Sequence, residues 1–303
     1  MYKQTKALFL QVLTSMHAGG DSRLGVVDQP IQREGHTRFP KVEASSLKGS
    51  LRRAIEQTAP ENEVERFFGP KSQGELYASA LAFSDARLLF FPVRSVKGVF
   101  AWITCPLVLQ RFMDDMRLVH IHEFKLPPLD AIPLVTTKSK LDDNDKVMLE
   151  EYVFAINKEK DEVFTAFLKQ LIQVLPAGEL VKQHLISHAI IVPDNDFADF
   201  VQMSTEVVTR IRIDSTTGTV DKAGLFSEEY LPSESLLYSL AFFSDEHRAA
   251  SKGDSTDNSP EQAANIAKAF EQWMPEVFQI GANLTLGKGF VSAKLASGGG
   301  NDA

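Results

Sequence analysis

A long polar segment near the start of the chain carries residue types that can bind a phosphate-containing partner. Residues 17–44 show no sustained period of 2 or 3.6, and loops longer than about 12–15 residues are usually functional or disordered. From His17 to Arg53 the sequence holds seven Lys or Arg, Arg23 and Arg38 among them, against four Asp or Glu. This local charge of +3 contrasts with the −8 of the whole chain.

A helix expected over residues 45–57 places two more basic side chains together. Its apolar positions recur at helical spacing on one face: Leu47, Leu51, Ala54 and Ile55. Ser45 or Ser46 is a plausible N-cap, and the free amides of a helix N-terminus form an anion site. Lys48 and Arg52 are four residues apart and therefore share a face. A solvated helix face without a ligand has the same pattern.

A glycine-rich segment near the end of the chain is the third candidate. Gly287 and Gly289 flank Lys288, and glycines allow the backbone to approach a phosphate closely. A Gly-Lys-Gly sequence on its own is more often a simple turn. The three segments would lie near one face of a sheet and would together bind an anionic chain.

Composition restricts the class of protein. The chain has 303 residues, of which 44% are hydrophobic and 24% charged, as in ordinary globular proteins. No apolar run approaches the roughly 20 residues of a membrane span, and the start has no signal-peptide pattern, so we expect a cytoplasmic protein without a membrane partner. The single cysteine, Cys105, excludes an intramolecular disulfide and any multi-cysteine metal site.

The expected elements predict an α+β fold. A strand at 6–13 and the helix at 45–57 precede a continuous or interrupted strand at 76–92 and a strand at 98–104. A largely irregular insertion, including 112–145, leads to a helix at 164–175 and a strand at 187–192. This is the β-α-β-β-α-β order of ferredoxin-like and RNA-recognition (RRM-like) modules. A hairpin is expected at 207–226, a helix at 263–277 and a polar loop at 251–260.

Several motifs carry a family resemblance. HAG (17–19), LGVVDQPIQRE (24–34) and FPKVEASSLKGSLR (39–52) resemble the start of RAMP-superfamily proteins of type III CRISPR effectors. FGP (68–70), SDAR (84–87), FPVRS (91–95) and GVFAWITCP (98–106) resemble, more narrowly, the family of the fourth Cmr subunit of type III-B complexes. LFSEEYLP (225–232) and the terminal glycine-rich loop fit the same family.

The resemblance implies a backbone subunit of an RNA-guided effector. Such proteins stack as a helical filament along a CRISPR guide RNA, beside other effector subunits, and cleave a complementary target RNA once per subunit. A hairpin thumb presses between bases and displaces a nucleotide at regular intervals. The chain would then be one RAMP domain, 1–303, with a palm at about 1–106 and 236–296, an inserted region at about 107–200 and a thumb at about 207–226.

The resemblance also implies roles for single residues. Asp28 matches the family's catalytic aspartate and His17 its assisting histidine, while Glu228 and Tyr230 match an acid and a tyrosine near the thumb. Activity in the family depends on a divalent cation, which we expect to be Mg²⁺ or Mn²⁺, bound transiently and, if by any of these residues, by Asp28. The predicted RNA-binding residues are Ser45, Ser46, Lys48, Arg52, Arg23, Arg38, Gly287, Lys288 and Gly289.

The chemistry of RNA cleavage is compatible with these residues. RNA supplies its own nucleophile, the 2′-OH, so a cleaving protein needs alignment, a base and charge stabilisation. Asp28 suits a metal ligand or a proton acceptor, and His17 an acid or a base. Two other functions remain open: a structural guide-binding subunit without cleavage, and a free-standing nuclease that processes precursor guide RNA.

Overall fold

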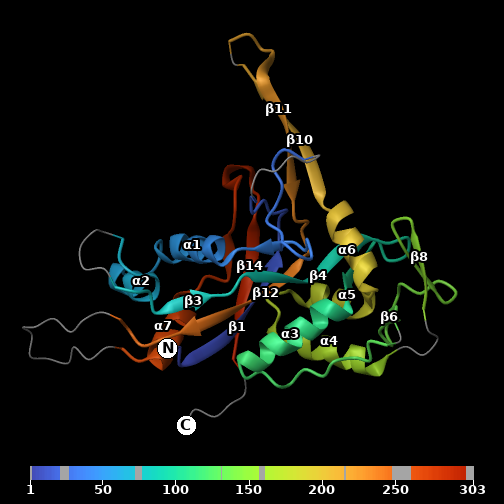
Figure 1. Cartoon of the computed structure of the whole chain (residues 1–303), viewed down its shortest axis with the longest axis horizontal. Helices are drawn as coiled ribbons and strands as arrows, with labels where there is room; N and C mark the ends of the chain where they lie inside the picture. The colour runs from blue at the N-terminus through green and yellow to red at the C-terminus, as the bar shows by residue number, and fades with distance from the viewer. Residues whose placement is uncertain are drawn as a thin grey trace, which may run out of the picture.

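The computed structural model describes residues 2–20, 27–71, 77–130, 132–156, 161–214, 216–247 and 261–297. The basic residue Arg23 and the expected loop 251–260 lie outside these ranges. Within them the chain has the α+β fold that the sequence predicts, built around one large mixed sheet (Figure 1). None of the helices described is long and apolar enough to cross a membrane.

The large sheet has ten strands, eight of which follow in the order β13-β14-β1-β12-β4-β5-β9-β6. Neighbouring strands are antiparallel except β5 and β9, which are parallel. Two short strands complete the sheet, β2 on β4 and β3 on β12. The bounds are Gln4–Val12 (β1), Lys41–Val42 (β2), Leu81–Phe83 (β3), Ala86–Arg94 (β4), Phe100–Thr104 (β5), Leu134–Val135 (β6), Ala189–Ile191 (β9), Leu236–Phe243 (β12), Val277–Gln279 (β13) and Phe290–Ala296 (β14).

One central strand is not predicted from the sequence. The chain does contain β1, a helix, β4, β5, a helix and β9 in the predicted order, but β12 lies between β1 and β4. Seven of the eight residues of β12 are buried, so this strand lacks the alternation that marks a half-exposed strand, and periodicity alone cannot distinguish it from a buried helix. The region expected as a continuous or interrupted strand at 76–92 is interrupted, because β3 ends at Phe83 and β4 begins at Ala86.

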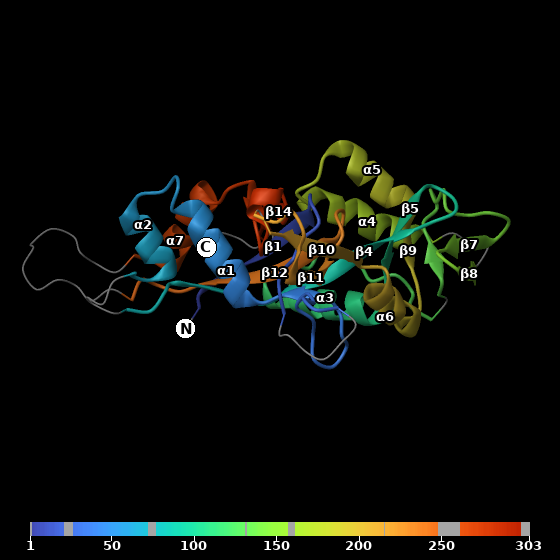
Figure 2. The same cartoon turned by 90° about the horizontal axis from the view of Figure 1, so that it is seen from above.

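Helices cover both faces of the sheet. Figure 2 shows α4 and α5 on one side of β4, β5 and β9, and α3 and α6 on the other, while α1, α2 and α7 lie together at the opposite end of the molecule. The bounds are Ala44–Ile55 (α1), Glu61–Phe68 (α2), Pro106–Leu118 (α3), Glu162–Val174 (α4), Glu179–His188 (α5), Asp194–Met203 (α6) and Ala263–Trp273 (α7), with a 3₁₀ turn at Leu284–Leu286.

Two expectations about helices are wrong. The irregular structure expected from residue 112 onward is helical as far as Leu118, because Pro106 occupies the first turn of α3, where a missing N–H costs nothing. The N-cap of α1 is Glu43 rather than Ser45 or Ser46, which lie within the first turn of the helix. The Glu43 side chain makes no capping hydrogen bond.

A long hairpin projects from the body of the protein (Figure 1). Its strands are β10 (Glu206–Ile213) and β11 (Val220–Tyr230), so the hairpin lies where the sequence predicts one, but β11 extends four residues further. A second, shorter hairpin is formed by β7 (Lys146–Leu149) and β8 (Tyr152–Ala155). The base of β11 enters the body beside the loop that follows β1, and this junction brings the candidate site together.

Candidate RNA-cleavage site at the base of the hairpin

The last residues of β11 form a polar cluster with β10 and with the loop between β13 and β14, residues 280–289, called the C-terminal loop below. Glu228 Oε2 accepts hydrogen bonds from Tyr230 Oη at 2.5 Å and from Arg210 Nε at 2.9 Å. Arg210 and Asn283 each donate to Tyr230 Oη at 2.8 Å. The strand register explains this grouping, because Arg210 faces Phe226, and residues 226, 228 and 230 share one side of β11.

The cluster fixes the charge of its two central groups. Burial raises the pKa of Glu228, but hydrogen bonds from Tyr230, Asn283 and Arg210 outweigh it and hold the pKa below its ordinary value. Burial and the neighbouring Glu228 carboxylate raise the pKa of Tyr230. Near neutral pH the site therefore contains an ionised Glu228 and a neutral Tyr230 that donates to it.

His17 joins this cluster from the loop after β1. Its Nδ1 lies 2.7 Å from the carbonyl oxygen of Glu229, and its ring centroid is 5.6 Å from that of Tyr230. The C-terminal loop packs on the His17 backbone at Gly281, where a Cβ would lie 2.2 Å from the His17 carbonyl oxygen. A side chain at position 281 would therefore push this loop away from the site.

Asp28 lies beside the cluster on the edge of β11. Its segment pairs with the strand through a bridge between Gln29 and Glu228. Both the backbone N–H and the hydroxyl of Ser227 donate to Asp28 Oδ2 at 2.8 Å, and these hydrogen bonds lower the pKa of this exposed carboxyl. Asp28 is thus an ionised, accessible carboxylate whose position is set by Ser227.

The four predicted catalytic residues therefore meet at one place but differ in accessibility. His17, Glu228 and Tyr230 are at most 6% exposed, whereas Asp28 is exposed to solvent. Of these four residues, Asp28 is the one exposed to solvent in this conformation. The other three can set the position and the electrostatic environment of the groups around it.

Sequence analysis does not identify several residues that build this site. Arg210 and Asn283 hold the Glu228–Tyr230 pair, Ser227 holds Asp28, and Glu229 pairs with Arg33. The Arg210 contact lies within one hairpin, whereas the other contacts join segments 53 to 199 residues apart, so no local pattern predicts them. The alternation of Arg210 and Arg212 with isoleucines in β10 is the only local signal, and it indicates no more than a two-faced strand.

The predicted RNA-binding residues of α1 have partners within the protein. Lys48 Nζ donates to Ser79 Oγ at 2.7 Å and to the Leu81 carbonyl at 2.9 Å. Burial, followed by the charge of Arg52, lowers the pKa of Lys48. Ser46 Oγ accepts a hydrogen bond from a neighbouring glutamine side chain, and Ser45 is exposed.

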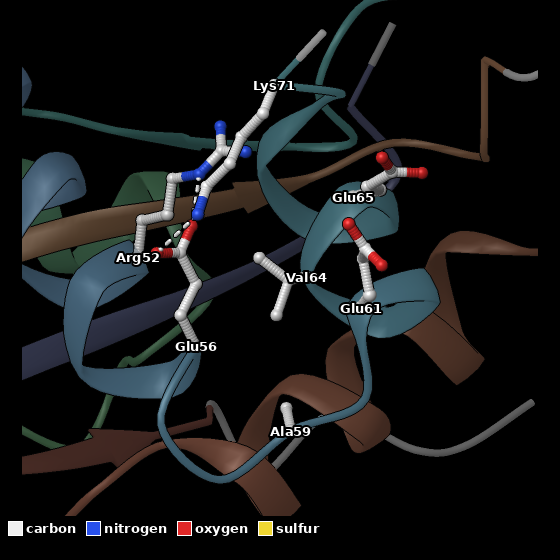
Figure 3. A pocket seen from close by; sticks show the side chains of 7 residues that line it. All are labelled: Arg52, Glu56, Ala59, Glu61, Val64, Glu65 and Lys71. Carbon is white, nitrogen blue, oxygen red and sulfur yellow. Dashed lines mark hydrogen bonds and ion pairs between the residues drawn. The ribbon is translucent and has the colours of Figure 1, made fainter.

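Arg52 faces a pocket between α1 and α2 rather than the hairpin. Figure 3 shows Arg52 and Lys71 both reaching Glu56, at 2.8 Å each. Glu61 and Glu65 line the other side of this pocket, whose volume is about 240 Å³. Because its guanidinium pairs with Glu56, Arg52 binds a phosphate only if that ion pair opens or is shared.

The remaining predicted RNA-binding residues that the structure describes are Lys288, the two glycines that flank it, and Arg38. Lys288 Nζ lies 4.8 Å from the centroid of the Tyr230 ring, a geometry typical of a cation–π contact. Gly287 is exposed, whereas Gly289 is buried and a Cβ there would lie 2.1 Å from the Ile280 carbonyl oxygen. Arg38 is exposed. The structure thus brings Lys288, Gly287 and Gly289 to the cluster.

Asp28 is the candidate ligand for the divalent cation expected from the sequence. Among the residues that the structure describes, no group of three or more His, Cys, Asp or Glu is placed to hold a metal ion. Both hydrogen bonds from Ser227 go to Oδ2 of Asp28, and the Asp28 residue is exposed to solvent. Mg²⁺ is commonly bound by one or two carboxylates together with substrate phosphates, so Asp28 fits a cation that arrives with RNA.

Comparison with known proteins gives a consistent family assignment. The RAMP superfamily model matches residues 9–292. The CRISPR system Cmr endoribonuclease Cmr4 of Pyrococcus furiosus is 38% identical over 291 residues, which are 94% of each chain.

Solved structures agree with the sequence relatives. A crystal structure of oligomeric Cmr4 from Pyrococcus furiosus matches with a TM-score of 0.71 at 31% identity, covering 96% of this chain and 97% of that one. A subunit of a type III-B Cmr-beta complex bound to cognate target RNA matches with a TM-score of 0.70, covering 97% of this chain and 98% of that one. At 20% identity the second likeness bears on the fold alone.

Proposed function

The chain belongs to the RAMP superfamily, and we propose that it is the backbone subunit of a type III-B CRISPR effector. It binds guide RNA as a helical filament and cleaves complementary target RNA at regular intervals. The observation that carries this proposal is the 38% identity to the Cmr4 endoribonuclease over 94% of the chain. Its partners are guide RNA, target RNA, further copies of itself and other effector subunits, and the likeness to oligomeric Cmr4 supports the self-association.

Within this proposal the chain is divided into a palm and a thumb. The strands around β1, β4 and β5 with α1 form a ferredoxin-like palm, and β10 and β11 form the thumb. Ile211 and Leu225 are paired across this hairpin and are 56% and 67% exposed. Apolar side chains exposed on a projecting hairpin favour a partner that covers them in the assembly.

Asp28 is the group that acts at the scissile phosphate. Hydrogen bonds from Ser227 lower the pKa of its carboxyl, so near neutral pH Asp28 is ionised and available as a ligand for a divalent cation. Mg²⁺ or Mn²⁺ held between Asp28 and the RNA would stabilise the charge that develops at the phosphate. The 2′-OH of the target is the nucleophile: it attacks the adjacent phosphorus while the bond from phosphorus to the 5′ oxygen breaks, and solvent takes the 2′-OH proton and protonates the departing 5′ oxygen. The thumb aligns this attack by displacing a nucleotide.

The residues of the buried cluster position the groups around Asp28 and do not make the initial contact with RNA. Ionised Glu228 fixes Tyr230 and Arg210, and His17 is held against the Glu229 backbone. Lys288 over Tyr230 and the glycine loop bring positive charge and accessible backbone to the same place. Preorganised groups of this kind lower the cost of aligning substrate during the reaction.

One observation favours a second function, that of a guide-binding subunit without cleavage. Three of the four predicted catalytic side chains are buried in the free chain. In that case the cluster would only stabilise the base of the hairpin.

A cleavage assay of the assembled complex separates the two functions. Labelled target RNA, complementary to the guide, is incubated with the complex and Mg²⁺, and the products are mapped. Discrete products at a constant spacing are expected, whereas bound but intact target would identify the structural function. The same reaction with EDTA tests the cation, because guide and target should remain bound while cleavage stops.

A further inference from the structure

Glu229 connects two segments that carry candidate catalytic groups. Its backbone N–H donates to the Gln29 carbonyl at 2.9 Å, next to Asp28. Its own carbonyl oxygen lies 2.7 Å from Nδ1 of His17. The backbone of one residue therefore contacts both the Asp28 segment and His17, while its neighbours in β11 are the other two candidates, Glu228 and Tyr230.

The Glu229 side chain extends this connection through a buried ion pair. Its Oε1 accepts from Arg33 Nη2 at 2.5 Å and from Thr205 Oγ1 at 2.9 Å, and its Oε2 accepts from the backbone N–H of Ile31 at 3.0 Å. The side chains of Glu229 and Arg33 are 7% and 6% exposed. The carboxylate thus holds two points on the segment that follows Asp28.

Arg33 continues the connection to the rest of the body. Its Nη1 donates to the carbonyl oxygens of Arg38 at 2.8 Å and of Val201 at 3.0 Å. The guanidinium therefore joins β11, the loop that contains Asp28 and the end of α6. The hydrogen bonds satisfy a buried charge pair that would otherwise be costly.

A buried ion pair often adds little to stability and is better explained by the arrangement that it specifies. Among the described residues, the Asp28 segment pairs with β11 through one backbone bridge, Gln29 to Glu228, and through the hydrogen bonds between Asp28 and Ser227. A strand pairing that is weakly specified can slip by one residue, and such a slip moves every side chain to the other face. Slippage here would remove Asp28 from Ser227 and from the cluster.

We propose that the Glu229–Arg33 pair positions Asp28, by locking the segment 27–33 in register on the base of the hairpin. The pair does not touch RNA. It acts through the Ile31 backbone and through Arg33, and it couples the position of β11 to that of Asp28. The cleavage consequence rests on the function proposed above, whereas the structural coupling does not.

The test uses Glu229→Gln in the assembled complex and in the free protein. Glutamine keeps an acceptor for the Ile31 N–H but loses the charge that holds Arg33. We expect the single-turnover cleavage rate to fall about 10- to 100-fold, because small misplacements of catalytic groups have effects of this size. The KM for target RNA should stay within about twofold, since no RNA contact is removed. Hydrogen exchange of residues 27–33 should accelerate, whereas that of β1 and β12 should not.

A second variant covers the case in which Arg33 without its partner prevents folding. Arg33→Met combined with Glu229→Gln contains no unpaired buried charge, and it should fold and show the same faster exchange and slower cleavage. Asp115→Asn is the matched control. Asp115 also pairs with an arginine, Arg87, at 2.7 Å, but it lies on α3 away from the hairpin. It should leave the exchange of 27–33 and the cleavage rate unchanged.

The outcomes separate this inference from the proposed function. Unchanged exchange of 27–33 in the folded double variant, or unchanged cleavage despite faster exchange, would overturn the positioning role. Loss of cleavage with a large rise in KM would also overturn it, because the pair would then serve RNA binding. If the wild-type complex does not cleave, the proposed cleavage activity fails, and hydrogen exchange alone decides whether the pair locks the segment.

Discussion

Tyr230 is the residue whose environment ties the buried cluster together. Its hydroxyl donates to Glu228 and accepts from Arg210 and Asn283. A group placed in this way can tune the position of an ionised carboxylate without contacting RNA. Its contribution to cleavage is therefore separable from its contribution to stability.

Tyr230→Phe should slow target cleavage by at least tenfold and lower the free energy of unfolding by about 1–3 kcal/mol, because buried partners lose a hydrogen bond. Tyr238→Phe is the matched control. Tyr238 is also buried and donates to a carboxylate, Asp115, at 2.8 Å. Thermal unfolding should show a comparable loss of stability for both variants. Single-turnover assays should show slower cleavage for Tyr230→Phe alone. Equal cleavage rates for the two variants would show that the cluster contributes only to stability.

Glu34 gives the fold a dependence on acid pH. Burial raises the pKa of Glu34, but the hydrogen bonds and charge of Arg111 and the hydroxyl of Thr37 outweigh it and lower the pKa below its ordinary value. The folded protein therefore binds the proton less readily than the unfolded chain. The stabilisation is complete above the ordinary glutamate pKa of about 4.3 and is lost as the pH falls through the lowered value.

Denaturant unfolding at pH 7 and pH 3.5 checks this expectation. Wild-type protein should lose stability on acidification, and Glu34→Gln should be less stable at pH 7 but lose less between the two pH values. A parallel loss in both proteins would show that Glu34 does not contribute to the acid dependence.

The hairpin is the element that connects the site to its surroundings. Its outer part has exposed apolar residues, and its turn is held mainly by Asp214, whose carboxylate accepts the N–H groups of Thr216 and Thr217. An isolated two-stranded hairpin is marginally stable in water, so its outer part should become ordered only in the assembly.

Hydrogen exchange across 207–226, with and without RNA in the complex, measures this ordering. We expect fast exchange in the free protein and strong protection in the complex. Excising residues 215–218 should leave the body folded, because the core strands lie elsewhere, and should impair cleavage at every position. Strong protection in the free protein, or normal cleavage after the excision, would make this hairpin part of the body rather than a thumb.

The basic residues of α1 have partners within the protein, so their removal should change stability as well as any RNA binding. Lys48→Ala with Arg52→Ala should lower the free energy of unfolding by about 1–3 kcal/mol, since buried acceptors and Glu56 lose their donors. If these residues also bind the guide backbone, the double variant weakens guide binding equally across sequences and flattens its salt dependence. An unchanged salt slope in a folded variant would remove both residues from the RNA interface. Arg53→Ala, on the same helix, is the control.

At the scale of the whole molecule, the sequence predicts the elements better than their arrangement. The apolar run of β1 and the helical spacing of α1 and α4 predict these elements correctly. Strand β12 is missed because it is buried on both faces, and α3 is missed because its second half falls in the charged, proline-containing stretch 112–145, whose composition favours irregular structure.

For the site, the four candidate residues are predicted but their neighbours are not. Family resemblance supplies Asp28, His17, Glu228 and Tyr230, and the structure places them together. Their neighbours could not be predicted, because Arg33 and Glu229 are 196 residues apart in sequence and His17 and Glu229 are 212 apart. Nor does any sequence pattern indicate that three of the four residues are buried, since burial depends on the packing of the C-terminal loop over the hairpin base.

The most direct test of the account is Asp28→Ala in the complete complex with guide RNA, matched target RNA and Mg²⁺. Asp28 is the accessible, ionised group of the site, so its removal should abolish cleavage while the Kd values for guide and target change little. Asp114→Ala removes another exposed aspartate, on α3, and serves as the control. We predict intact, bound target with Asp28→Ala and regularly spaced products with wild-type protein and Asp114→Ala. Full cleavage by Asp28→Ala would contradict this prediction.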